Sequence, residues 1–306
     1  MLRSFIIKKL FLAVLIALGV ITGTFLLLYL SSDPVATLLP AEARAEDIEE
    51  FRKAMGLNDP LPVQLVRFIW QVMQFDFGTS YINKLPVTKL ILERLPASLE
   101  LAAAGFLFYI CFSIPLGVLA AIKRFSFLDN LSTIIAVVGM AMPIYWYGIM
   151  LIIFFGVKLQ ILPISGRGDF THLILPMVTL GTFLAPVGMR LTRSAMIDVL
   201  NQDYIRTARA KGLSLTSIYF KHALKNAILP VISAVFVQMG LLLSGAVVTE
   251  TVYAWPGLGR LAATAIIAGD YPLVRALVIL FTLFVVTANL IGDIIISALD
   301  PRIRLK

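Results

Sequence analysis

Very few residues of this chain carry charge or the side chains that catalysis and metal binding need. Charged residues make up only 14% of its 306 residues, and it has two histidines and one cysteine. The sequence contains no G-x-x-x-x-G-K-[ST] phosphate loop, no H-E-x-x-H pair, no nucleophile elbow and no Cys/His cluster with zinc spacing. We therefore expect neither catalysis nor a cofactor bound by this chain. Its one cysteine, Cys111, cannot form an internal disulfide, and its apolar surroundings predict a small buried side chain.

Apolar residues, by contrast, dominate the chain. They make up 59% of the sequence, and the mean hydropathy is +0.92, more than a soluble domain could bury. A bilayer span needs roughly 20 apolar residues, and it must be helical because an unpaired backbone group in lipid costs several kcal/mol. The sequence therefore predicts an all-α, polytopic membrane protein with six transmembrane helices, at about residues 7–30, 97–121, 131–156, 172–192, 227–249 and 276–298.

The distribution of charge predicts which helix ends face the cytoplasm. The net charge is +8, and the basic residues gather in segments 1–6, 122–130, 193–226 and 299–306, whereas segment 31–96 is mixed in sign. The positive-inside rule explains this pattern without a nucleic-acid partner. We expect both termini in the cytoplasm and three regions, which are an N-terminal transmembrane helix at 1–30, an extracytoplasmic loop region at 31–96 and a core transmembrane domain at 97–306. The first apolar run is longer than the roughly 7–15 residues of a signal peptide, so we expect it to stay uncleaved.

Two short helices are expected in the loop region, and several spans contain helix-breaking residues. A charged helix near Ala41–Met55 should precede an amphipathic helix at Val63–Phe75 that lies near the membrane interface.

Proline bends a helix and removes a backbone donor, and Pro115, Pro143 and Pro186 all lie in expected spans. Any one of them can reflect ordinary packing, but together they favour a bundle that moves.

Three polar residues in the spans admit two interpretations. Gln238, Asn289 and Asp293 could line a translocation path, because polar groups at membrane depth often mark one. They could instead join helices by hydrogen bonds, and for Asp293 either such a bond or an ion pair with a nearby cytoplasmic Lys or Arg is the favoured explanation.

The loop at 251–275 is also open to two interpretations. One is a turn capped by a tryptophan at the membrane interface. The other is a re-entrant or gating element that contacts an external binding protein or the mouth of a cavity. The residues concerned are Trp255, Pro256, Gly257 and Arg260.

The basic segment at 193–226 is long for a connection between two spans. A helix near 201–213, with the small residues Ala208, Ala210 and Gly212, predicts a surface on which another protein can approach closely. Gly212 is expected to end this helix in a left-handed conformation. A helix that binds anionic lipid is the alternative. The candidate docking residues are Asp203, Tyr204, Arg206, Thr207, Ala208, Arg209, Ala210, Lys211 and Gly212.

Here the sequence resembles a known family. Asp203-Tyr-Ile-Arg-Thr-Ala-Arg-Ala-Lys-Gly212, followed by Pro230, is similar to the coupling-helix signature of ABC importer permeases, in the subfamily that imports dipeptides, oligopeptides and nickel complexes. The glutamate that opens the general signature is absent, which is usual for this subfamily. Further matches run along nearly the whole chain, at Gly56–Leu61, Asp76–Ser80, Arg94–Leu101, Trp255–Arg260, Asp270–Pro272 and Asp300–Arg304.

The resemblance implies a type I (MetI-like) importer permease in a bacterial or archaeal cytoplasmic membrane. Such permeases pair with a second, related permease, and two cytoplasmic ATPase subunits that bind ATP and Mg dock on the coupling helices. An external solute-binding protein delivers the cargo, which would be a peptide or a nickel or other metal chelate. Besides lipid, no further partner is implied. The competing hypotheses are a carrier or channel working alone and an intramembrane enzyme. The absence of mid-membrane charges opposes an ion-coupled carrier, the long inner docking segment opposes a simple channel, and the missing nucleophile and metal patterns oppose an enzyme.

Overall fold

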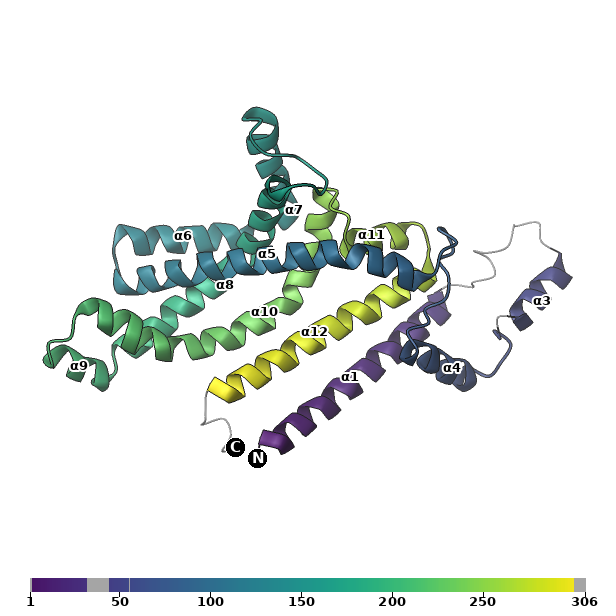
Figure 1. The fold of residues 1–306 in the computed structure, drawn as a ribbon, viewed down its shortest axis with the longest axis horizontal. Coiled ribbons are helices and arrows are strands. Elements are labelled where there is room, and N and C mark those ends of the chain that lie inside the picture. Colours follow the sequence, from purple (N-terminus) through teal and green to yellow (C-terminus); the bar gives the residue numbers. More distant parts are fainter. Residues whose placement is uncertain (1, 32–43, 55, 300–306) are drawn as a thin grey trace.

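The computed structural model describes residues 2–31, 44–54 and 56–299, and this part of the chain is almost entirely helical (Figure 1). Its elements in chain order are α1 (Leu2–Ser31), α3 (Ala45–Ala54), α4 (Leu61–Met73), α5 (Val87–Ile122), α6 (Phe127–Ala141), α7 (Ile144–Leu151), the π-helix η1 (Ile152–Lys158), α8 (Phe170–Leu200), α9 (Asp203–Ala210), the π-helix η2 (Ser217–Ala223), α10 (Leu224–Val252), α11 (Leu258–Ile267) and α12 (Tyr271–Leu299). The Asp300–Arg304 motif lies outside the described residues.

Five of these helices are long and apolar enough to cross a membrane. They contain the segments Ile7–Leu27, Val87–Ile122, Phe170–Leu200, Ser217–Gly240 and Tyr271–Ile295, and a bent pair of helices makes up a sixth if it is counted as one span. The expected all-α membrane fold is therefore confirmed. The second helix begins ten residues earlier than expected, at Val87 rather than 97, so it takes in the end of the predicted loop region.

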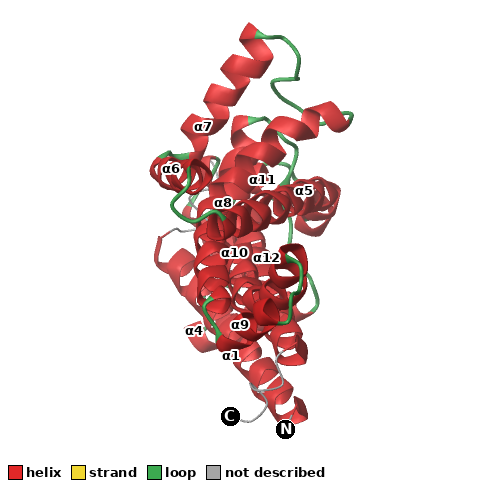
Figure 2. Ribbon diagram, turned by 90° about the vertical axis from the view of Figure 1, so that its left-hand side faces the viewer, coloured by secondary structure: helices red, strands yellow, loops and turns green. Residues whose placement is uncertain are grey.

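The third expected span, 131–156, is not one straight helix. Helix α6 ends at Ala141, and the pair α6 and α7–η1 is bent by 109°. Met142 is extended, with ψ of 126°, because the ring of the following Pro143 disfavours a helical residue before it. The segment after the bend projects away from the other helices (Figure 2).

The core forms where α5, α8 and α10 pack together. Its buried side chains include Leu101, Leu180 and Met196. Glycines allow the close approach of α5 and α8, since a Cβ atom at Gly181 would lie 2.8 Å from the carbonyl oxygen of Gly105. Cys111 points away from this core and is exposed, so the prediction that it is buried was wrong.

Helix α1 lies along α12 at the side of this core (Figure 1). Many apolar side chains of α1 are exposed, such as Phe11 and Leu27, as expected of a surface covered by lipid. The two short helices predicted before α5 are present as α3 and α4. We refer to the two ends of the bundle as the α9 end and the α11 end.

Candidate coupling surface and gate junction

Helix α9 is fixed to the rest of the chain through one of its faces. Ile205 is fully buried and Ala208 is 7% exposed, and both belong to the cluster that contains Ile218 of η2. The hydroxyl of Tyr204 accepts a hydrogen bond from Nδ2 of Asn226, on α10, at 2.8 Å. A hydrogen bond therefore connects α9 to the start of α10.

The chain leaves α9 through a glycine-dependent turn. Gly212 has a φ of +74°, a conformation that L side chains disfavour. Its N–H donates to the carbonyl oxygen of Arg209 at 3.0 Å, and the N–H of Leu213 donates to that of Ala208 at 3.3 Å. This pair of bonds is a Schellman motif, and it confirms the predicted left-handed end of the helix.

The opposite face of α9 is open and mainly basic. Arg209 and Lys211 make no ion pair with a described residue, whereas Arg206 lies 3.4 Å from the carboxylate of Asp203. The exposed residues of the predicted docking segment are Asp203, Tyr204, Arg206, Thr207, Arg209, Ala210, Lys211 and Gly212.

Ala208 does not lie on the exposed surface of α9, although the sequence predicted it as part of a contact surface. Its side chain packs inward, so a small residue is needed there for the chain's own packing. A glutamate at Ala208 would disturb that packing before it affected a partner. Ala210 and Gly212 are the small residues that a partner can reach.

An ion pair missed by the sequence analysis joins the 122–130 segment to α8 near the α9 end. Nε and Nη2 of Arg193 donate to the two carboxylate oxygens of Asp129 at 2.6 and 2.9 Å. Asp129 is 3% exposed, and it also accepts from the N–H of Phe125 at 2.9 Å. The sequence feature that could have revealed this pair is that Asp129 is a lone carboxylate in a segment whose other charged residues are basic.

At the α11 end, a second buried carboxylate connects three helices. Glu250, near the end of α10, is 1% exposed. It accepts from the hydroxyl of Ser98 on α5 at 2.5 Å and from the N–H of Arg260 on α11 at 3.0 Å. We call this arrangement the gate junction. A glutamate in an otherwise apolar helix was the signal that could have identified it.

Trp255 and Gly257 belong to the gate junction. Trp255 is 1% exposed, and its Nε1–H donates to the carbonyl oxygen of Ala97 at 2.8 Å. The interpretation of Trp255 as a tryptophan at the membrane interface was therefore wrong. A Cβ atom at Gly257 would overlap the carboxylate of Glu250, so a side chain there would force that carboxylate to move. Pro256 is half-buried and Arg260 is exposed.

The N-cap residue of α8, Asp169, also lies at the α11 end of the bundle, outside the membrane-spanning segment. The carboxylate of Asp169 accepts hydrogen bonds from the hydroxyl and the N–H of Thr171 and lies 2.9 Å from Nδ1 of His172. The Thr171 hydroxyl, followed by His172, lowers the pKa of Asp169 to about 2. Asp169 is therefore a carboxylate at neutral pH, where it complements the positive end of the helix dipole.

No hydrogen bond or ion pair joins the three predicted path residues to one another in the described part of the chain. Asp293 forms an ion pair at 2.7 Å with Lys9 of α1, as the favoured explanation expected. Gln238 is 6% exposed, whereas Asn289 is exposed. None of the three lines either of the two cavities described next.

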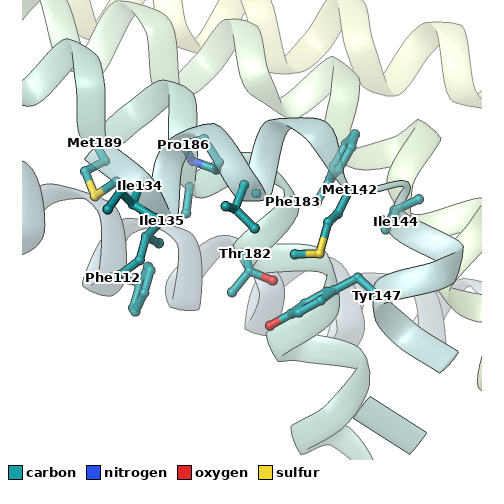
Figure 3. Close-up of a pocket in the computed structure, with 13 residues that line it drawn as sticks. Phe112, Ile134, Ile135, Met142, Ile144, Tyr147, Thr182, Phe183, Pro186 and Met189 are labelled. Atoms are coloured by element: carbon teal, nitrogen blue, oxygen red, sulfur yellow. The ribbon is translucent and has the colours of Figure 1, made fainter. Parts of the chain in front are cut away.

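Two apolar cavities flank the core. One, of about 320 Å³, lies at the bend between α6 and α7, where Figure 3 shows Met142, Tyr147 and Thr182 around it. The other, of about 310 Å³, lies between α5, α10, α11 and α12 and includes Ser98 and Glu250 of the gate junction in its wall. Movement of the junction would therefore change the shape of the second cavity.

The chain matches two family models that together cover nearly all of it. Residues 113–305 match the family described as binding-protein-dependent transport system inner membrane component. Residues 1–102 match the N-terminal region of such membrane components.

Curated relatives match over almost their full length. The glutathione transport system permease protein GsiC of Salmonella paratyphi A is 39% identical over 304 residues, which is 99% of each chain. The dipeptide transport system permease protein DppB of Escherichia coli K12 is 37% identical over 340 aligned positions, again 99% of each chain.

A solved structure shares the fold. The MetNI methionine ABC transporter, in an inward-facing conformation, matches with a TM-score of 0.57 at 20% identity, over 70% of this chain and 97% of that one. The chain belongs to the family of binding-protein-dependent transport system inner membrane components, and it is an ABC transporter permease, a transport subunit rather than an enzyme.

Proposed function

We propose that this permease conducts short peptides into the cytoplasm, and that two ATPase subunits drive it through α9 and the corresponding helix of a second permease. The open basic face of α9, on a helix fixed to the core and to α10, is the observation that carries the proposal. The relatives named above belong to glutathione and dipeptide transport systems, and short peptides are the cargo class that these two have in common. A solute-binding protein would deliver the cargo to the opposite side, as the family description implies.

The proposed orientation places the α9 end and both termini in the cytoplasm. The support is the clustering of Lys and Arg at 122–130 and 193–226, which the positive-inside rule assigns to the cytoplasmic side. In this orientation the gate junction lies on the external side. Pro256, Gly257 and Arg260 are then near the surface on which a binding protein would dock, while Trp255 supports them from within.

The mechanism follows from the contacts at the two ends. ATP binding to the partner subunits would draw the two α9 helices together, because a rigid docking helix moves with the surface on which it lies. The Tyr204–Asn226 contact would pass this motion to α10, and the Asp129–Arg193 pair would couple the first turn of α6 to the same motion. Glu250 lies in the last turn of α10, so a tilt of α10 would disturb the gate junction and alter access to the cavity beside it.

Peptide cargo is favoured over nickel chelates by the names of the relatives. Among the described residues no group of three or more His, Cys, Asp and Glu could hold a metal ion, although a chelated metal would not need one. Gln238 remains a proposed polar contact of the path, whereas the ion pair of Asp293 with Lys9 supports a role in joining α12 to α1.

Uptake into vesicles tests the proposed function. The complete transporter is reconstituted with its binding protein, and uptake of labelled dipeptide, glutathione and nickel–histidine is measured side by side with ATP inside the vesicle. We expect ATP-dependent uptake of a peptide and none when the ATPase subunits are omitted. Peptide uptake without ATPase subunits would refute the coupling, and uptake of nickel–histidine alone would refute the proposed cargo.

A further inference from the structure

A polar pocket lies beside α1 at the α11 end, apart from the core and the gate junction. Its volume is about 290 Å³, and its walls come from the end of α1, from α4, from the 76–81 segment and from the first turns of α12. The residues on which the argument depends are Phe25, Arg67, Phe68, Asp76, Tyr81 and Arg275.

Arg275 has no anionic partner in the described part of the chain. Its guanidinium lies 5.0 Å from the centre of the Phe68 ring, and no hydrogen bond or ion pair joins it to a described residue. Tyr81 lines the same pocket; burial raises the pKa of its phenol, and the positive charge of Arg275 opposes that rise. A partly buried guanidinium has five donors and is costly to leave unpaired, so this arrangement suits an external anion.

The carboxylates around the pocket already have partners. Asp59 pairs with Arg67 at 2.5 Å, and Asp76 accepts from the N–H of Gly78 at 3.0 Å. Asp270 accepts from the hydroxyl of Ser80 and, at 3.0 Å, from the N–H of Tyr81. None of these described carboxylates neutralises Arg275, so its charge can attract an external anion.

An apolar groove begins where the polar pocket ends. It runs along the outer face of α4, and Arg67 borders both spaces. Val66, Trp70 and Met73 line the groove and are 66%, 61% and 67% exposed. The groove has a volume of about 460 Å³. An anion site that opens directly into an apolar groove matches a molecule with a charged head and a hydrocarbon tail.

We propose that this pocket and groove bind one phospholipid, with its phosphodiester against Arg275 and an acyl chain along α4. The neighbouring α1 supports this assignment because it is long and apolar enough to cross a membrane and exposes many apolar side chains, and its Phe25 lines the pocket. An arginine guanidinium binds a phosphate group through charge-assisted hydrogen bonds. The lipid would fasten α4, α1 and α12 together at the membrane surface.

Native mass spectrometry of the purified full chain tests the proposal. The chain is loaded from phosphatidylglycerol vesicles and, in parallel, from vesicles of a neutral galactolipid that has similar tails but no phosphate. We expect one retained phosphatidylglycerol per chain and no retained galactolipid. Arg275→Gln should weaken retention about tenfold, since it removes a charge-assisted contact, and Arg275→Lys should weaken it less. Arg94→Gln, which changes an exposed arginine outside the pocket, should retain lipid like the unmodified chain.

Three results would overturn the proposal. One is equal retention of phosphatidylglycerol by Arg275→Gln and the unmodified chain, with both folded by circular dichroism. Another is thermal stabilisation by inorganic phosphate that equals stabilisation by phosphatidylglycerol, which would assign the pocket to a free anion. The third is a loss of solute-binding-protein affinity in Arg275→Gln with lipid retention unchanged, which would assign it to that protein.

Discussion

Breaking the Asp129–Arg193 pair should destabilise the permease and weaken its coupling to ATP hydrolysis. Asp129 has a side chain only 4% exposed, and Arg193 approaches it through two nitrogens. Removing one partner of a fully buried pair costs roughly 3–5 kcal/mol, because the other charge is left unpaired. Since the side chain of Arg193 is 31% exposed, and Phe125 still donates to Asp129, we expect about 2–3 kcal/mol for Arg193→Gln.

A double-mutant cycle in mixed detergent micelles measures this contribution. The unfolding free energy is determined for Asp129→Asn, Arg193→Gln and the double variant, and the two changes should be coupled by about 1–2 kcal/mol. Asp198→Asn is the matched control, because Asp198 is an exposed carboxylate on the same helix as Arg193. It should change stability by less than about 0.5 kcal/mol. A coupling energy near zero, or an effect of Asp129→Asn no larger than that of the control, would refute the reasoning.

Three further predictions concern the gate junction, α9 and the cap of α8. Gly257→Ala should cost about 1–3 kcal/mol of unfolding free energy, because its Cβ meets the held carboxylate of Glu250; an unchanged denaturation midpoint would contradict this. Ala208→Leu should lower stability by about 1–3 kcal/mol and Ala210→Leu by less than about 0.5 kcal/mol, and equal losses would contradict the packing of α9. Asp169 has a pKa of about 2, lowered from 3.8, so its stabilising effect relative to Asp169→Ala should be complete above pH 4 and should disappear as the pH falls towards 2. A pH-independent difference between these two proteins would contradict it.

The membrane-spanning helices and the local turns could be predicted from the sequence. The long apolar runs specify spans because lipid leaves the backbone no alternative to a helix. The end of α9 follows from Gly212, since glycine accepts a positive φ readily. The break at Pro143 was foreseen as a bend, but its size depends on the helices that pack on either side of it.

Features that depend on tertiary contacts could not be predicted. A pattern of small residues did not distinguish Ala208, which packs inward, from Ala210, which is exposed. Trp255 is buried because its N–H finds a backbone acceptor on α5, far away in the sequence. The partners of Glu250 and Asp129 come from other helices, so neither role was visible in the local sequence. The N-terminal limit of α5 was placed too late because polar residues extend the helix beyond its apolar run.

The central claim is that α9 carries force from an ATPase subunit, and cysteine cross-linking tests it most directly. In the assembled transporter, Cys111 is first replaced by Ala, and a single cysteine is introduced at Arg209, on the open face of α9, or at Ile267, which is 87% exposed on α11. We predict that the cysteine at 209 cross-links to an ATPase subunit, that its yield changes when ATP is bound, and that the cysteine at 267 gives no such product. Cross-links from position 209 to lipid alone, with none to an ATPase subunit, would contradict the account.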